Sequence, residues 1–250
     1  MIYWVWLTTV PFIGPVTANK LLKKYRYPEK VYQAERQELE NIPGMTRKQI
    51  DSILSSRSLD MAEKILENCD RHNISILTQE NPNYLLKARE PQDAPILLYY
   101  RGRAFPKEQT VGIVGARRCS QEAKQKAIAL TEKCVAKKMT IISGMAKGID
   151  SYAHTACLYA GGSTIAILGN GLDICYPSEH RKLMECIMEK GLILSEYPPG
   201  TLPAQYRFPK RNRLISAWSD LLYVIAPGKG SGALITAEYE KSYGRKVHII

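Results

Sequence analysis

A buried-strand pattern followed by a glycine-rich loop occurs twice near the middle of this chain and decides its fold. The first copy reads Thr140-Ile141-Ile142-Ser143-Gly144-Met145-Ala146-Lys147-Gly148-Ile149-Asp150, and the second reads Thr164-Ile165-Ala166-Ile167-Leu168-Gly169-Asn170-Gly171-Leu172-Asp173. Short apolar runs bounded by glycine are typical of strands that are buried on both faces. Glycines directly after such strands allow backbone N–H groups, here together with Lys147, to face a phosphate. The stretch is therefore a candidate binding surface on an α/β domain.

Similar strand-like runs recur on both sides of this stretch. They begin near Val111, Thr140, Thr164, Leu192, Leu221 and Lys246, at intervals of 24 to 29 residues, with helix-like segments between them. Apolar strands that alternate with helices specify a parallel sheet covered on both faces. The pattern predicts a doubly wound α/β domain over residues 107–250. Expected N-caps of its helices are Ser120, Asp150 and Ser178, and expected C-terminal glycines are Gly161, Gly191 and Gly244.

The first 106 residues follow a different pattern. Residues 1–66 predict a small all-α domain, in which segments 10–22 and 41–50 each place a glycine turn before a helix. These segments resemble helix-hairpin-helix units, whose turns allow N–H groups to meet a DNA phosphate. The sequence is equally compatible with a small helical bundle whose turns contact no ligand. Residues 67–106 are rich in proline and are expected to form a bridging segment packed on the sheet domain.

The charge of the chain favours a polyanionic partner. The formal net charge is +11, and residues 107–250 hold 20 basic against 12 acidic side chains. Such an excess favours nucleic acid, although a merely soluble basic protein has the same composition. The six cysteines contain no C-x-x-C pair, which indicates thiols of a reducing compartment. With no secretory signal and no apolar run of about 18 residues, we expect a cytoplasmic protein without a membrane segment.

The loops that follow the predicted strands contain most of the candidate site. Ligands of open parallel sheets bind beyond the carboxyl ends of the strands, where the strand order reverses. The loops there combine glycines with basic side chains, and a helix-opening segment adds Phe208 between Arg207 and Lys210. The candidate binding residues are Gly115, Arg117, Arg118, Ser143, Gly144, Lys147, Gly148, Gly169, Phe208, Lys210, Arg211, Asn212, Arg213, Ser231 and Gly232, with Lys229 in the last loop.

Other site chemistries find no support in the sequence. The dinucleotide pattern G-x-G-x-x-G and the P-loop pattern are both absent, so we expect no nucleotide cofactor. No nucleophile triad, carboxylate pair or metal-ligand spacing emerges, so we expect neither a metal nor a catalytic residue. His154 is expected to be a packing residue more than a site residue. Phe208 is either a base-stacking platform or a core anchor for its loop.

Taken together, these motifs resemble those of a known family, the bacterial DNA-processing protein A (DprA, or Smf) family. The resemblance spans residues 111–250 continuously and also fits the helical front end. It is carried by Gly115-Ala116-Arg117, Ser143-Gly144 to Asp150 with Ala153-His154, Gly161-Gly162, Gly171-Leu172-Asp173 with Tyr176-Pro177, Ser195-Glu196-Tyr197, Phe208-Pro209 with Arg211-Asn212-Arg213, and Ser231-Gly232-Ala233-Leu234-Ile235-Thr236-Ala237.

The resemblance implies an extended Rossmann-type domain that binds single-stranded DNA. It also implies a role in natural transformation, in which the protein protects incoming strands and loads the recombinase RecA, and no enzymatic activity. Family members continue past the strand ending at Ile250 with a dimer-forming segment, so the chain is expected to be a fragment whose homodimer is weakened. Members often carry lysines where this chain has Gln205 and Ser178, which lowers the expected charge of the pocket.

Two rival hypotheses remain open. The stretch 228–238 resembles the glycine loop of phosphoribohydrolases with a related Rossmann fold, in which Glu238 would be the catalytic carboxylate acting on a nucleotide. Alternatively, the helical front domain binds a protein partner and contributes nothing to DNA binding.

Overall fold

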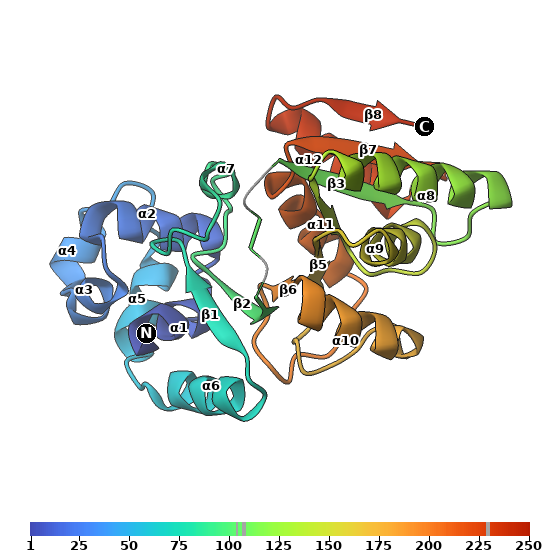
Figure 1. Cartoon of the computed structure of the whole chain (residues 1–250). Coiled ribbons are helices and arrows are strands. Elements are labelled where there is room, and N and C mark those ends of the chain that lie inside the picture. The colour runs from blue at the N-terminus through green and yellow to red at the C-terminus, as the bar shows by residue number, and fades with distance from the viewer. Residues whose placement is uncertain (104, 107–108, 229–230) are drawn as a thin grey trace. The chain divides into compact units, whose positions relative to one another are not determined.

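The chain folds into two compact units, Met1–Leu98 and Tyr99–Ile250, in a computed structural model (Figure 1). The structure describes residues 1–103, 105–106, 109–228 and 231–250. Lys229 of the last candidate loop lies outside these residues. The segment boundaries proposed from the sequence, at residues 66 and 106, stay predictions.

The first unit is mainly helical. Its elements are α1 (Ile2–Thr9), α2 (Pro15–Tyr25), α3 (Pro28–Gln33), α4 (Arg36–Glu40), α5 (Arg47–Ser55), α6 (Asp60–Arg71), β1 (Ser75–Thr78) and α7 (Leu86–Arg89). Helices α2 and α5 follow the two glycine turns identified in the sequence. Proline at the first position of α2 and a capping box between Thr46 and Gln49 of α5 set these starts. Gln49 Nε2 also donates to Thr17 Oγ1 at 3.1 Å, which joins the two helices.

The second unit contains a mostly parallel sheet. Its strands are β2 (Leu97–Gly102), β3 (Thr110–Gly115), β4 (Thr140–Ser143), β5 (Thr164–Leu168), β6 (Leu192–Ser195), β7 (Leu221–Ile225) and β8 (Val247–Ile249). They lie in the order β2-β6-β5-β4-β3-β7-β8. Only the pairing of β2 with β6 is antiparallel among the described pairs of this unit. The strand positions predicted from the sequence are confirmed.

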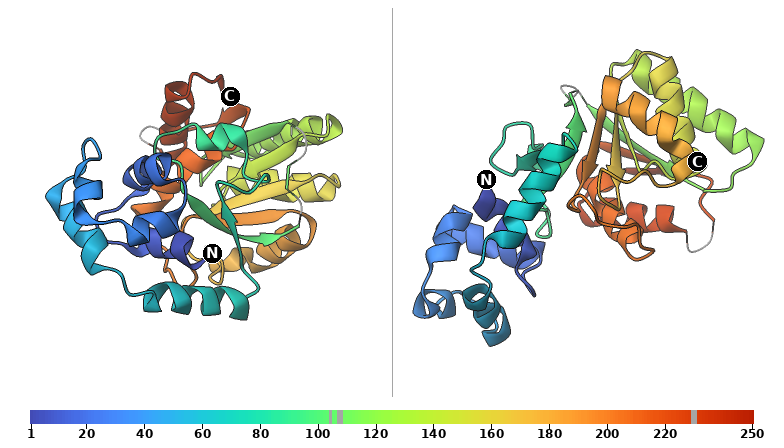
Figure 2. Two further views of the ribbon diagram at one scale, coloured as in Figure 1. Left: turned by 90° about the vertical axis from the view of Figure 1, so that its left-hand side faces the viewer. Right: turned by 90° about the horizontal axis from the view of Figure 1, so that it is seen from below.

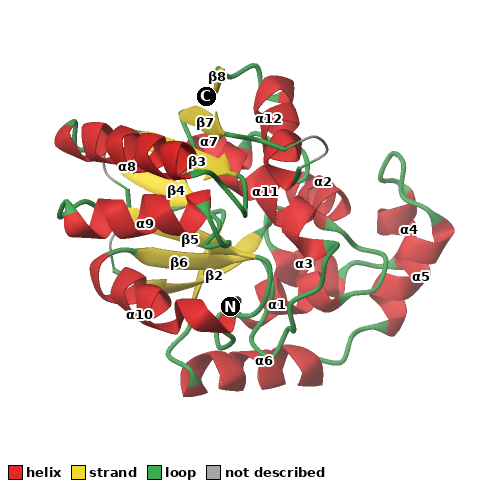
Figure 3. Cartoon of the chain, turned by 90° about the vertical axis from the view of Figure 1, so that its right-hand side faces the viewer, coloured by secondary structure: helices red, strands yellow, loops and turns green. Residues whose placement is uncertain are grey.

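Helices cover both faces of this sheet, as the doubly wound prediction requires (Figures 2 and 3). One face carries α8 (Gln121–Ala136), α9 (Ile149–Tyr159) and α10 (Arg181–Lys190), the last preceded by the 3₁₀ turn η1 (Ser178–His180). The other face carries α11 (Arg207–Ala217) and α12 (Gly232–Ser242). The chain runs outward from β3 through β4 and β5 to β6, then returns to the other side of β3 with β7 and β8. The strand order therefore reverses at β3.

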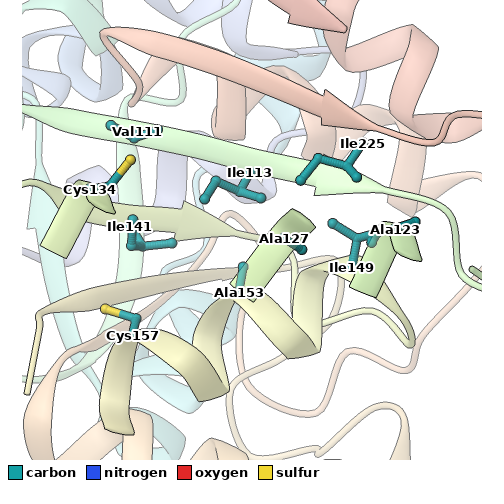
Figure 4. Packing of buried hydrophobic residues seen from close by; sticks show 10 residues of the cluster. All are labelled: Val111, Ile113, Ala123, Ala127, Cys134, Ile141, Ile149, Ala153, Cys157 and Ile225. Atoms are coloured by element: carbon teal, nitrogen blue, oxygen red, sulfur yellow. The ribbon is translucent and has the colours of Figure 1, made fainter. Parts of the chain in front are cut away.

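An apolar cluster between the sheet and helices α8 and α9 forms part of the core (Figure 4). Ile113, Ile141 and Ile225 project from three adjacent strands and are completely buried. Ala123, Ala127 and Ala153 face them from the two helices. Small alanine side chains allow the helices to lie close to the strands, so the branched strand residues fill the space between the layers.

Helix ends agree only partly with the capping predictions. Ser120 is the N-cap of α8, with its hydroxyl accepting from Ala123 N at 3.2 Å, and Gly161 and Gly244 follow helices with left-handed φ angles. The Asp150 prediction was wrong because α9 begins at Ile149 and Asp150 lies inside its first turn. Ser178 begins η1 rather than capping it, and Gly191 ends α10 with a φ of −145°.

No helix in the described ranges has the length and apolar character needed to cross a membrane.

Replacing Ile141 with alanine is expected to lower the free energy of unfolding by about 2–5 kcal/mol, because the closely packed core cannot collapse onto the cavity left by the missing atoms. Urea unfolding measures the change. The control is Tyr159→Ala, which truncates a side chain that is 90% exposed and should change stability by less than about 0.5 kcal/mol. Equal losses in the two variants would contradict this account of the core.

Candidate nucleic-acid interface

An open cleft of about 630 Å³ lies where the strand order reverses. The cleft is lined by Gly115, Arg117 and Arg118 of the loop after β3, and by Ser231 and Gly232 at the start of α12. Phe208, Arg211 and Asn212 of α11 form a further wall. A smaller cavity of about 70 Å³ shares Arg117, Phe208 and Arg211 and adds Gly144 and Lys147. Loops that are far apart in the sequence thus meet at one edge of the sheet, as expected from the position of the strand ends.

An aromatic pair with an arginine beside it faces this cleft. The rings of Phe208 and Tyr176 stack with their centroids 5.4 Å apart and their planes inclined by 24°. The guanidinium carbon of Arg117 lies 5.8 Å from the centroid of Phe208. Gly169 provides room for this arrangement, because a Cβ there would lie 3.0 Å from Cδ1 of Phe208. Phe208, in the first turn of α11, is half-buried and Tyr176 is 45% exposed, so the Phe208 ring packs partly against the protein and also borders the cleft.

The loop between Ser143 and Gly148 does not present the phosphate cradle expected from the sequence. Asp150 Oδ2 already accepts from Gly144 N at 3.1 Å and from Ala146 N at 3.4 Å. The Ser143 hydroxyl donates to Ile113 O at 2.6 Å and is fully buried. A carboxylate of the protein therefore fills the position in which a bound anion was expected. Gly148 has a φ of +80°, and a Cβ there would lie 2.2 Å from Ala116 O, so packing of the two loops requires this glycine.

Arg211 is a buried cation that joins several of these loops. Its Nη1 donates to Gly144 O at 2.5 Å and to Ile167 O, and its Nε donates to Asn212 Oδ1 at 3.1 Å. A Cβ on Gly144 would lie 2.5 Å from its guanidinium carbon, so glycine is needed for this close approach. Burial lowers the pKa of Arg211 to about 10, while Asp150 acts in the opposite direction. The side chain is 4% exposed and thus holds the loops rather than facing solvent.

Asp150 is the anionic partner of this arrangement. Burial raises the pKa of its carboxyl, and the opposing influences are the Arg211 charge, the two N–H donors and Arg117. A buried carboxylate is tolerated where hydrogen bonds and a cation compensate for lost water. The floor of the cleft therefore contains an internally compensated pair of charges.

Two more of the predicted basic residues have acidic partners. Arg213 donates from Nη2 to both oxygens of Glu196, at 2.7 and 2.8 Å, and is buried. Lys147 Nζ lies 2.8 Å from Glu179 Oε2, and this hydrogen bond holds the pKa of the Glu179 carboxyl below its ordinary value. Both members of the Lys147–Glu179 pair are 56% exposed, so this pair can exchange with a ligand.

The structure thus divides the predicted residues into two groups. Ten line the cleft or its small cavity, namely Gly115, Arg117, Arg118, Gly144, Lys147, Phe208, Arg211, Asn212, Ser231 and Gly232. Five line neither, namely Ser143, Gly148, Gly169, Lys210 and Arg213. Asn212 Nδ2 also donates to Gly232 O at 2.8 Å, which ties α11 to the start of α12.

His154 takes the packing role expected for it. The Thr164 hydroxyl donates to Ile141 O at 3.0 Å, so the His154 Nδ1–H donates to Thr164 Oγ1 across the 2.7 Å contact between them. Burial, with the nearby Arg211 charge, lowers the pKa of His154 to about 3. The ring is therefore neutral and forms part of the core beneath the cleft.

Three site residues were missed by sequence reasoning. Glu196 directly follows β6 and was detectable by the rule that selected the other loop residues. Glu179 and Tyr176 lie in the connection between β5 and α10, but further along it than the residues directly after the strand that the rule considered. The contact of Tyr176 with Phe208 spans 32 positions of sequence. Among the described residues, no cluster of His, Cys, Asp and Glu side chains could hold a metal ion.

Replacing Arg211 with methionine is expected to lower the free energy of unfolding by about 3–5 kcal/mol at about pH 8, because Asp150 becomes a buried charge without its cation. The pKa of Asp150 then rises further, so the folded protein takes up a proton at a pH where the unfolded carboxyl is still ionised. The deficit should shrink as the pH falls toward about 5. The double variant Arg211→Met, Asp150→Asn should recover part of the loss at the higher pH. Urea unfolding at both pH values measures these effects, and a deficit independent of pH and of Asp150 would contradict the assignment.

Comparison with known proteins matches both units of the chain. The model of the family described as DNA recombination-mediator protein A matches residues 74–250. The model described as a SAM-like helix-hairpin-helix tandem matches residues 7–57, in agreement with the two glycine turns.

Individual relatives extend over much of the chain. Protein Smf of Synechocystis sp. is 37% identical over 250 residues, which cover 98% of this chain and 63% of that protein. DNA processing protein DprA of Streptococcus pneumoniae is 41% identical over 165 residues, which cover 64% of this chain and 57% of that protein. The chain thus spans less than two thirds of the length of these curated relatives.

Solved structures show the same architecture. The X-ray structure of DNA processing protein A from Streptococcus pneumoniae superimposes with a TM-score of 0.81 at 30% identity, over 99% of this chain and 84% of that one. DNA processing protein A from Helicobacter pylori, whose structure concerns its single-stranded DNA binding mode, gives a TM-score of 0.63 at 30% identity, over 70% of this chain and 80% of that one. From its motifs, its strand order and these matches, the chain belongs to the DNA recombination-mediator protein A family.

Proposed function

We propose that this chain binds single-stranded DNA in the cleft and acts as a recombination mediator of natural transformation, not as an enzyme. The observation that carries the proposal is the exposed Arg117 beside the stacked rings of Phe208 and Tyr176. A cation next to an aromatic platform suits a chain of stacked bases joined by phosphates. A mononucleotide pocket would not need an open groove.

Exposed basic side chains supply the phosphate contacts in this proposal. Arg117 and Arg118 are exposed at the cleft, Lys147 is exposed at its small cavity, and Lys210 is exposed on α11. These four cations, unlike Arg211 and Arg213, have their charged ends within reach of water. Phosphate contacts carry no base information, so we expect binding without strong sequence preference.

The relatives support the biological setting. The Helicobacter pylori structure, which is described in terms of the single-stranded DNA binding mode of that protein, covers 70% of this chain. We further propose RecA as a protein partner and a homodimer as the assembly, both from the family resemblance. A cytoplasmic site of action accords with scattered cysteines that form no C-x-x-C pair.

The geometry gives less support to the phosphoribohydrolase alternative. Its catalytic carboxylate would be Glu238, which is exposed on α12 and is not among the residues that line the cleft. Incubation with nucleoside monophosphates should release no free base, and release that depends on Glu238 would favour the enzyme.

The affinity for an oligothymidylate should fall with salt at a log–log slope of about −3, because about four phosphates are neutralised at about 0.7 each. The variant Arg117→Ala, Arg118→Ala should bind roughly tenfold to a hundredfold more weakly and with a slope shallower by about 1.4. Fluorescence anisotropy at several salt concentrations measures both quantities.

The matched control is Lys133→Ala, Lys137→Ala, which removes the same charge from exposed positions at the end of α8. This end of α8 leads into the start of β4, so it lies near the amino-terminal ends of the strands, whereas the cleft lies beyond their carboxyl ends. If the two double variants lose affinity equally, net charge alone explains binding and the cleft is not the site.

Replacing Glu179 with glutamine should raise the affinity a few-fold, because Lys147 no longer has to leave an ion pair with Glu179 before it contacts a phosphate. Glu189→Gln removes the same charge from an exposed position of α10 and serves as the control. A gain of the same size in both variants would show that only the overall charge matters.

A further inference from the structure

A second aromatic surface lies at the start of α11. Tyr206 precedes the first residue of this helix and is 60% exposed. The guanidinium carbon of Arg207 lies 5.1 Å from the ring centroid of Tyr197 and 5.3 Å from that of Tyr206, and Lys210 Nζ lies 5.6 Å from the Tyr206 centroid. Tyr197, Arg207, Tyr206 and Lys210 thus form an alternating aromatic–cation row.

The positive charge of this row is not neutralised locally. Residues 197–213 contain no aspartate or glutamate. In the part of the chain that the structure describes, neither Arg207 nor Lys210 forms an ion pair, and the nearby Glu196 pairs with Arg213. Arg207 Nη1 donates to Leu202 O, a neutral acceptor. The two cations of the row therefore keep their full charge beside an open ring.

The row begins at the rim of the cleft. Gln205 and Pro209 line the cleft, and they are the chain neighbours of Tyr206 and Lys210. Tyr206 and Lys210 are four positions apart across the first turn of α11, so their side chains lie on one side of the helix. A polymer that leaves the cleft past Gln205 and Pro209 meets this surface next.

We propose that the aromatic–cation row extends the path of a bound single strand beyond the cleft. In this arrangement one base stacks on the exposed ring of Tyr206, and Arg207 and Lys210 hold the phosphates on either side. Every base has a π-face, so this contact adds affinity without sequence preference. The proposal rests on the proposed function, since the strand must first occupy the cleft.

Oligothymidylates of increasing length, from about 4 to about 16 nucleotides, test the proposal over the known range of site sizes. For Tyr206→Ala we expect the affinity for the shortest bound strand to be unchanged and that for longer strands to fall roughly fivefold or more. Tyr206→Trp should retain the affinity at every length, because it keeps a stacking surface. The control is Tyr159→Ala, which truncates a tyrosine that is 90% exposed at the end of α9 and should change nothing.

A long strand with abasic nucleotides outside the cleft-bound segment separates stacking from charge. Wild-type protein should bind it about as weakly as Tyr206→Ala binds the intact strand. The proposal is overturned if Tyr206→Ala matches the wild-type protein at every length, or if it loses affinity equally at all lengths. Failure of the wild-type protein to bind any length would instead refute the proposed function itself.

Discussion

The loops around the cleft depend on two buried opposite charges, Asp150 and Arg211, which attract each other and are each hydrogen-bonded to the backbone. Asp150 accepts from the N–H groups of Gly144 and Ala146, while Arg211 donates to the carbonyls of Gly144 and Ile167. The two side chains thereby join the ends of β4 and β5 to α9 and α11. Because neither charge is solvated, each needs the other, and the positions of Phe208 and Asn212 on α11 depend on both.

The basic residues of this region have two separate tasks. Arg211 and Arg213 are buried and donate hydrogen bonds to protein acceptors, so they organise the structure. Arg117, Arg118 and Lys210 keep exposed charges, and Lys147 shares its charge with an exposed glutamate. The excess of positive charge in residues 107–250 is therefore not all available to a ligand, and the part available at or beside the cleft belongs to Arg117, Arg118, Lys147 and Lys210.

The fold could be predicted from the sequence because its signals are local. The strands of the parallel sheet are short, mainly apolar runs. The rule that ligands bind beyond strand ends selected seven of the ten candidate residues that line the cleft or its small cavity, and the other three come from the segment that opens α11. The partners of the charges could not be predicted in this way. Glu196 binds Arg213 across 17 positions and Arg211 reaches Gly144 across 67, and nothing local distinguishes these arginines from exposed Arg117. Asp150 resembled a helix cap because its N–H donors belong to the loop directly before it, while its cation, Arg211, comes from the distant helix α11.

The glycine at position 144 has a consequence for how a ligand is released. By admitting the Arg211 guanidinium against the backbone, it gives the cleft a floor that is already electrically balanced. An entering phosphate therefore meets a buried cation, Arg211, that already donates to protein carbonyls, and the charges open to it belong to exposed side chains such as Arg117 and Arg118. In the proposed function, contacts of exposed side chains break one at a time, so a long strand is released progressively. Such reversibility accords with the proposed role of a recombination mediator, which passes its strand on.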